Sequence, residues 1–365
     1  MANYDLTSLA VQMLVPNNKV IVDDTGIPSI YVWIPKFKLS DVLNTTSTAT
    51  HPAFIRNGKE IEGFWAGKYQ AKVYNNVAYS LPAEDPTVYT NLDQAISRCS
   101  AKGAGHHLMT NAEWAAIALW CKKNGFQPNG NNNYGKDVSE SNYKAVPTYM
   151  DGTKVGRVAT GTGPVSWYHD GTMAGIADLN GNVWEWQGGL RTVFGEVQIL
   201  ANNDASDPNN PQNTTSLSWK AIRASDGALV TSECTVGGSA VTSGATVKVD
   251  FVSNKITYST NQTALADAAK DCDFAAVTAD STISDEAKLL LRALCLLPDE
   301  GSTSADYNGD HVWMNNGASE RSFFRGGYWG DGSRLGVFAL GGYSSRSHSR
   351  TGGIGLRAAY VDVDQ

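Results

Sequence analysis

The chain has 365 residues, of which 42% are hydrophobic and 18% are charged, and its formal net charge is -7 at pH 7. This composition is typical of a globular protein with a sizeable core. Lys and Arg do not cluster, which excludes nucleic-acid binding through phosphate contacts. The 36 glycines, ten tryptophans and fifteen tyrosines indicate many turns and aromatic packing rather than long helices.

The cysteines and the N-terminal segment bear on the cellular compartment. The five cysteines include no close pair, so neither a disulfide framework nor a thiolate metal site is expected. The first 18 residues lack a basic region and a long apolar run, and no later run reaches membrane-spanning length. We therefore expect no signal peptide, synthesis in the cytoplasm and no membrane insertion. Action outside a cell then requires release, for example as part of a phage particle.

The first third of the chain combines strands with two helices. Alternating apolar residues predict strands at 20–22, 30–35 and 64–70, and polar or Pro-marked stretches predict loops at 44–50 and 81–86. Asn91 caps a predicted helix over 92–102, with Gly103 at its C-terminal end.

Thr110 and Glu113 form a capping box for a second helix, in which Trp114, Ile117, Ala118 and Cys121 share one face. We interpret Glu113 as a cap rather than a catalytic acid. The Asn/Gly-rich stretch 128–135 that follows is predicted to be irregular surface.

A middle stretch, 191–305, resembles no known family. A Ser-Asn-Lys turn between 247–251 and 256–258 predicts a β-hairpin. Ser284 caps a predicted helix over 285–297, which Pro298 terminates. The expected buried face of that helix is Leu289, Leu290, Ala293 and Leu296.

The stretch 175–187 places Trp184 and Trp186 on one face of a predicted strand and Glu185 on the other. The preceding turn of Asp, Asn and Gly offers the oxygen ligands that Ca²⁺ prefers. The candidate ligands are Asp178, Glu185 and the carbonyl groups of Gly181 and Val183. The alternative is an Asx-type turn, with Glu185 hydrogen-bonded to backbone.

The C-terminal stretch, Phe323 to Tyr360, carries apolar residues at strand spacing, interrupted by Gly pairs. The polar, Gly and aromatic positions between them have the composition of an adaptable binding surface. An ordinary solvated loop surface is the alternative.

Segments 107–114 and 178–186, together with Arg325-Gly326-Gly327 and Gly355-Leu356-Arg357, resemble the formylglycine-generating enzyme (sulfatase-modifying factor) family. The resemblance implies an α+β, C-type-lectin-like fold with little regular secondary structure. It also implies a structural Ca²⁺ held by Asp178, Gly181, Val183 and Glu185, although that family has Asn at the position of Asp178. The two active-site cysteines of the family fall on Asp331 and Gly336.

Without that thiolate pair, no copper site and no thiol chemistry are expected, and we predict that the protein is not an enzyme. The six histidines show no metal-ligand spacing and are interpreted as structural. The enzymatic alternative is a modifying enzyme of the same type that uses other residues.

The C-terminal stretch also resembles the variable region of diversity-generating retroelement proteins of phages and bacterial surfaces. The resemblance implies a noncatalytic receptor-binding protein whose hypervariable surface attaches to a protein or glycan on a target. A structural virion component is a further alternative. The expected ligand-binding positions are Tyr328, Gly330, Asp331, Arg334, Leu335, Gly341, Gly342, Tyr343, Ser344, His348, Arg350 and Gly353.

The expected organisation has four parts. An N-terminal β segment covers 1–40, and the first part of the lectin-like domain covers 41–190. The insertion at 191–305 is expected to pack on the core. Residues 306–365 complete the lectin-like domain and carry the variable region.

Overall fold

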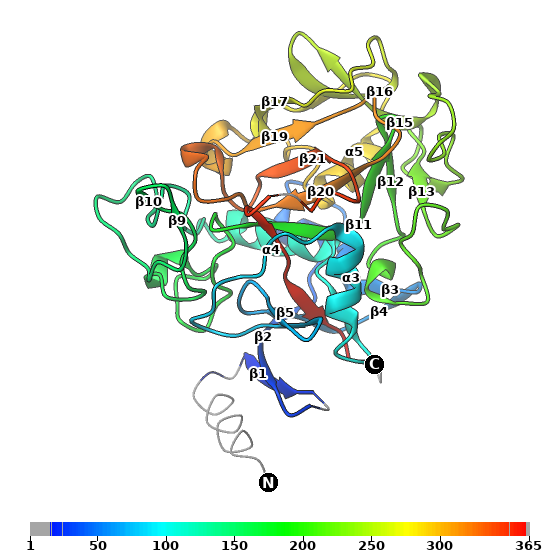
Figure 1. Cartoon of the computed structure of the whole chain (residues 1–365). Helices are drawn as coiled ribbons and strands as arrows, with labels where there is room; N and C mark the ends of the chain where they lie inside the picture. Colours follow the sequence, from blue (N-terminus) through cyan, green and yellow to red (C-terminus); the bar gives the residue numbers. More distant parts are fainter. Residues whose placement is uncertain (1–14, 16, 24, 350, 363–365) are drawn as a thin grey trace.

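The structure is a computed structural model that describes residues 15, 17–23, 25–349 and 351–362. It is mixed α and β, mostly sheet with few helices, as the sequence predicts at this level (Figure 1). The helices are α2 (Leu39–Val42), α3 (Leu92–Ser100), α4 (Asn111–Lys123) and α5 (Asp285–Ala293). Short 3-10 turns are η1 (Pro52–Phe54), η2 (Val165–Trp167), η3 (Asp204–Ser206), η4 (Phe274–Ala276), η5 (Ser304–Tyr307) and η6 (Gly332–Arg334).

A five-stranded antiparallel sheet joins the two ends of the described chain, because a C-terminal strand lies between strands from the first third. Figure 1 shows this strand, β23, beside β5. In sheet order the strands are β1 (Asn18–Val22), β2 (Pro28–Pro35), β5 (Gly63–Gly67), β23 (Ala358–Tyr360) and β8 (His106–Leu108). The predicted strands at 20–22, 30–35 and 64–70 are confirmed, although the last ends at Gly67.

A twelve-stranded sheet joins the middle of the chain to its C-terminal part. Its main path is β17 (Lys270–Asp273), β19 (His311–Met314), β21 (Leu340–Ser344), β20 (Arg321–Arg325), β11 (Trp184–Val193), β12 (Glu196–Ile199), β15 (Ser243–Val252), β16 (Lys255–Asn261) and β18 (Thr278–Ala279). Off this path lie β13 (Lys220–Ile222), β14 (Leu229–Val230) and β22 (Ile354–Gly355). The hairpin predicted at 247–258 is confirmed as β15 and β16, with the turn residues Ser253 and Asn254 at positive φ.

Three two-stranded ribbons complete the strands: β3 (Ile55–Arg56) with β4 (Lys59–Glu60), β6 (Lys72–Tyr74) with β7 (Val77–Tyr79), and β9 (Met150–Asp151) with β10 (Lys154–Val155). Helix α4 contacts α2, η1, β11 and α5, which makes it the central helix of the main core. Its predicted capping box is confirmed, because Thr110 Oγ1 accepts from Glu113 N and Glu113 Oε2 accepts from Thr110 N.

Helix α5 starts at the predicted cap, Ser284, but ends at Ala293 rather than at 297. Cys295 adopts a left-handed backbone, and Arg325 Nη2 donates to the carbonyl oxygens of Leu294 and Cys295, each at 3.0 Å. The tertiary contact therefore replaces the last helical turn. The predicted buried face is confirmed for Ala293 and Leu296 and corrected for the rest, because Leu289 and Leu290 are half-buried and Ala287 and Leu291 are buried instead.

Helix α3 is capped by Asn91 as predicted but ends at Ser100 rather than at 102. The segment 128–135 is irregular, as predicted. The prediction that it lies on the surface is wrong, because Asn131 and Asn132 are buried. Asn131 Nδ2 donates to Gly156 O at 2.8 Å, and Asn132 Nδ2 donates to Asp137 Oδ2 at 2.8 Å. These amides satisfy backbone and carboxylate groups inside the loop, so the segment is irregular but internal.

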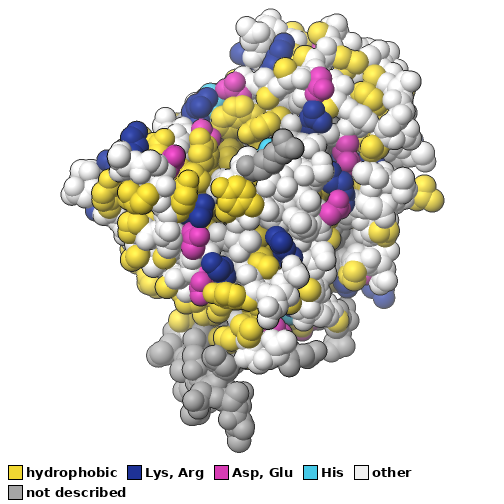
Figure 2. Space-filling model, viewed as in Figure 1, with side chains coloured by type: hydrophobic (Ala, Val, Ile, Leu, Met, Phe, Trp, Pro, Cys, Tyr) yellow, Lys and Arg dark blue, Asp and Glu magenta, His cyan; other side chains and the backbone are white. Residues whose placement is uncertain are grey.

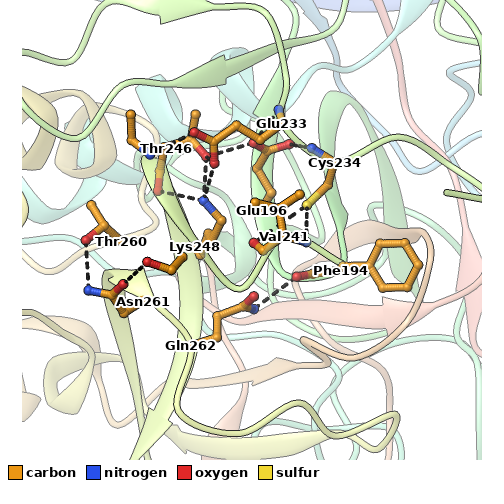
Figure 3. Close-up of polar contacts among 12 residues, drawn as sticks. Phe194, Glu196, Glu233, Cys234, Val241, Thr246, Lys248, Thr260, Asn261 and Gln262 are labelled. Carbon is orange, nitrogen blue, oxygen red and sulfur yellow. Dashed lines mark hydrogen bonds and ion pairs between the residues drawn. The ribbon is translucent and has the colours of Figure 1, made fainter. Parts of the chain in front are cut away.

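A buried polar network ties β12 and β15 to the loop around Glu233 (Figure 3). Lys248 Nζ lies 2.6 Å from Glu233 Oε2, and the Lys248 side chain is fully buried. The Glu196 carboxylate accepts from the backbone N–H groups of Glu233 and Cys234 and from Thr246 Oγ1. The loop is thereby fixed to the sheet by charge-assisted hydrogen bonds.

Candidate binding site

An open pocket of about 490 Å³ lies where the first residues of β11 meet β19, β21 and the segments that follow β20 and β21. Seven aromatic side chains line it, and the space-filling view shows apolar and charged side chains interleaved on the molecule (Figure 2). We call it the aromatic pocket. Its lining residues are Tyr89, Tyr149, Trp184, Trp313, Tyr328, Trp329, Asp331, Arg334, Tyr343, Ser344, His348, Thr351, Gly352, Gly353 and Ile354.

The base of the pocket is built from aromatic rings packed edge to face. The Trp184 ring lies 5.0 Å from Phe324 and 5.8 Å from Trp313, at steep angles. Tyr343 packs on the same Phe324 at 5.2 Å. Such pairs add specific geometry to the burial of large apolar area. As predicted, Trp184 and Trp186 share the face of β11 that packs on Phe324.

The opposite wall is held by the β9–β10 ribbon and the loop before α3. Trp329 Nε1 donates to Asp151 Oδ2 at 3.2 Å, which fixes the indole to β9. Tyr89 has a φ of 55°, a left-handed conformation that is uncommon for a Tyr. Its hydroxyl would meet a Cβ placed on Gly352, so Gly at 352 allows the ring to approach.

Arg334 and Asp331 are charged side chains that line the pocket. The Arg334 guanidinium lies 3.8 Å from Asp271 and 3.9 Å from Asp331, and it stacks over Trp313. Asp331 lines the pocket, whereas Asp271 lies outside the lining and also contacts His311 Nδ1 at 3.2 Å. Burial raises the pKa of Asp331, with Arg334 opposing the shift. The pocket thus combines aromatic faces with a desolvated carboxylate and an accessible guanidinium, a set that offers both stacking and hydrogen-bonding groups.

The structure brings most of the predicted ligand-binding positions to this pocket: Tyr328, Asp331, Arg334, Tyr343, Ser344, His348 and Gly353 line it. Gly330 lies against the Tyr328 hydroxyl, next to the lining. Arg350 lies outside the described residues.

The expectation that Leu335, Gly341 and Gly342 belong to an exposed surface is corrected, because all three are buried. A Cβ on Gly341 would lie 2.1 Å from the Phe324 ring. A Cβ on Gly342 would lie 2.3 Å from the Phe323 ring. These glycines let strand β21 approach the aromatic layer, and Leu335 fills the core behind it.

Several lining residues were not predicted from the sequence, among them Tyr89, Tyr149, Trp313 and Thr351. Tyr89, Tyr149 and Trp313 come from separate stretches with no shared pattern, and only the tertiary fold brings them to Thr351 in the C-terminal stretch. Trp313 lies between Val312 and Met314 in a short, continuous apolar run, and nothing in that run indicates that its side chain is accessible.

The predicted calcium ligands Asp178, Gly181, Val183 and Glu185 also converge, beneath β11 and outside the pocket lining. The group at the point of convergence is the side-chain amide nitrogen of Gln70. A protein N–H donor at this point does not fit a ligand set for a divalent cation. Across the described part of the chain, no group of three or more His, Cys, Asp or Glu side chains is placed to hold a metal ion.

The positions of the enzyme family's cysteines have different surroundings here. Asp331 lines the pocket, whereas Gly336 is packed against Asp310, whose Oδ1 would lie 2.5 Å from a Cβ on that glycine. Burial raises the pKa of Asp310 well above its usual value. None of the five cysteines lines the pocket, and burial raises the pKa of the half-buried Cys272 thiol.

The fold and the site define a mixed α+β protein, mostly sheet, with an open aromatic pocket near its C-terminal strands. No family model and no curated protein matches the sequence. Among solved structures, the chain is similar to "Major Tropism Determinant P3c Variant", at 11% identity and a TM-score of 0.31, over 94% of this chain and 72% of that chain. It is also similar to "Major Tropism Determinant U1 Variant", at 12% identity and a TM-score of 0.31, over 93% and 70%.

Within the described residues, the structure contains no helix with the length and apolar character needed to cross a membrane.

Proposed function

We propose that this protein is a noncatalytic receptor-binding protein that attaches to a target surface through the aromatic pocket. One observation carries the proposal: polar and aromatic positions scattered over residues 328–353 meet on one open pocket above a buried aromatic base. Concave sites with aromatic walls and a few polar groups are typical of ligand binding. Tyr, Trp and Arg are also the side chains that most often dominate binding energy.

The proposed scaffold is C-type-lectin-like, related to the formylglycine-generating fold, and the proposed source of diversity is a retroelement that rewrites the pocket residues. Tyr343, Arg334 and Asp331 are supported as replaceable positions because they are exposed or half-buried over a fixed base. A near-copy of the DNA that encodes Phe323 to Tyr360, differing only at adenines and adjacent to a reverse-transcriptase gene, is the expected genomic context. Sequencing the flanking DNA tests this part.

The proposed absence of catalysis is supported by the packing of Gly336 against Asp310, which leaves no room for a second active-site thiol. Incubation with a cysteine-containing sulfatase peptide, with and without copper, tests it. Any turnover of the peptide would contradict this part of the proposal.

The proposed partner is a protein or a glycan on a cell surface, and the proposed location is a phage particle. The two similar solved structures are named tropism determinants, but their TM-score of 0.31 is too low to support this assignment. Binding of labelled protein to a panel of bacterial cells is the direct test. Pretreating the cells with protease or with periodate separates a protein receptor from a glycan.

The variant Tyr343→Ala with His348→Ala removes two lining side chains, and we expect it to lower cell binding by about tenfold or more. Leu217→Ala is the matched control, since Leu217 is 89% exposed and does not line the pocket. Equal binding by the double variant and the control would exclude the pocket as the contact site.

A further inference from the structure

Four oxygen atoms of the turn before β11, and of β11 itself, point at a single nitrogen atom. Gln70 Nε2 carries two N–H groups, and it lies within hydrogen-bond distance of the carbonyl oxygens of Asp178 at 3.1 Å, Gly181 at 3.2 Å and Val183 at 3.0 Å. It also lies 3.0 Å from Glu185 Oε1. Convergent carbonyl and carboxylate oxygens form the kind of cradle that suits a hard cation. Here the centre of the cradle is an amide nitrogen from the segment that follows β5.

The orientation of the Gln70 amide is determined by its neighbours. Gln70 Oε1 accepts from Asn182 Nδ2 at 2.9 Å, and the residue is fully buried. Exchanging the amide oxygen and nitrogen would aim an oxygen at four acceptors and remove the donor that they share, which is costly inside a protein. The hydrogen-bond network therefore requires N–H at the centre.

The negative charge of the cradle is already balanced by protein. Arg357 forms two parallel hydrogen bonds to the Glu185 carboxylate, Nε to Oε2 at 2.8 Å and Nη2 to Oε1 at 2.7 Å. The same Nη2 donates to Ala177 O at 3.0 Å. The Asp178 carboxylate points away from the centre, and its Oδ2 accepts a hydrogen bond from Gly161 N at 2.7 Å.

A divalent cation would have to displace the Gln70 amide and lie close to the Arg357 guanidinium. Calcium takes about six to eight oxygen ligands at roughly 2.3–2.6 Å, whereas this cradle offers four oxygens spaced for N–H donors. Both the geometry and the charge of the cradle favour the protein donors.

We propose that Gln70 and Arg357 take the place of a divalent cation, and that the turn at 178–183 is ordered without metal. Trp184 lies between two members of this cradle, Val183 and Glu185, so the same contacts set the base of the aromatic pocket. The conformation of the pocket residues and the thermal stability of the protein are then insensitive to chelators. This inference is independent of the proposed function, because it is read from stability rather than from ligand binding.

The first test uses the full-length protein. Thermal unfolding is measured after treatment with excess EDTA and again with added CaCl₂, and calcium binding is followed by calorimetry. We expect the same Tm in all conditions and no binding heat. A cation at about 100 times its Kd would raise the Tm by several degrees. A Tm that falls with EDTA and recovers with calcium, or calcium that copurifies at one ion per chain, would overturn the inference.

The second test is Gln70→Glu, which keeps the shape of the side chain but replaces the N–H donor with a carboxylate oxygen. We expect a loss of several degrees in Tm, because a buried carboxylate would face four acceptors. Gln94→Glu is the matched control, since Gln94 is exposed at the start of α3 and Glu serves equally in a capping box. An unchanged Tm for Gln70→Glu would overturn the inference, and a variant that does not fold leaves the decision to the metal measurements.

Discussion

Arg357 and Glu185 form a fully buried, bidentate ion pair between the segment preceding β23 and strand β11, with side-chain exposures of 0% and 1%. The pair connects the five-stranded sheet to the twelve-stranded sheet, because Arg357 also donates from Nη1 to Gly67 O in β5 at 2.9 Å. We expect Arg357→Met to lower the free energy of unfolding by about 3–5 kcal/mol, since the buried Glu185 carboxylate would lose its cation and keep the neutral Gln70 amide as a hydrogen-bond donor.

Chemical denaturation measures this change. The control is Arg223→Met, which removes an exposed pair with Asp226 and should have little effect on stability, because water screens exposed ion pairs. Equal effects of the two variants would show that the buried pair does not stabilise the contact between the sheets.

The network in Figure 3 gives a second prediction. We expect Lys248→Met to destabilise the protein by about 3 kcal/mol, because Glu233 would lose its cation beside the buried Glu196 carboxylate. The value lies at the low end for buried pairs, since the Glu233 side chain is 25% exposed. Lys255→Met, at an exposed position of β16, is the control in the same denaturation experiment. A small effect at Lys248 would mean that water replaces the lost ammonium group.

Alanine substitutions at Leu335 and His348 should distinguish a core position from a position on the binding surface. Leu335 is fully buried, so we expect Leu335→Ala to cost about 2–5 kcal/mol of stability through the cavity it leaves. His348 lines the pocket, and we expect His348→Ala to change stability by less than about 0.5 kcal/mol while weakening target binding. Denaturation and cell-binding assays on both variants check the contrast. A large stability loss for His348→Ala would place that side chain in the core.

The buried ammonium group of Lys102 gives a prediction for pH. Burial lowers the pKa of Lys102 to about 8, opposed by Asp23. Between the folded pKa and the unfolded value of about 10.4, the unfolded chain binds more protons, so this group makes stability rise with pH. We expect the unfolding free energy of wild type, minus that of Lys102→Met, to increase by about 1–3 kcal/mol from pH 7 to pH 10.

Unfolding curves for both proteins at each pH isolate this contribution, because the remaining lysines titrate equally in the two. A difference that stays constant with pH would indicate that Lys102 keeps an ordinary pKa in the folded state.

Local sequence patterns were sufficient for many elements. Alternation predicts β1 and β2, the Thr110–Glu113 capping box predicts the start of α4, and the turn at 253–254 predicts the β15–β16 hairpin. These features depend on neighbouring residues and on backbone preferences, so they can be read along the chain. Helix ends were less predictable, because α5 stops where Arg325, from a distant strand, takes the carbonyl oxygens of Leu294 and Cys295.

The sequence by itself determined the framework of the C-terminal stretch, the opposed faces of β11 and much of the set of side chains that surround the pocket. Only the tertiary structure decided which of them are accessible: Gly341 and Gly342 are pressed against Phe324 and Phe323, whereas Tyr343 reaches the pocket. It also decided what lies at the centre of the 178–185 cradle. Gln70 is more than a hundred positions away in the chain, and local patterns carry no information on such distant packing.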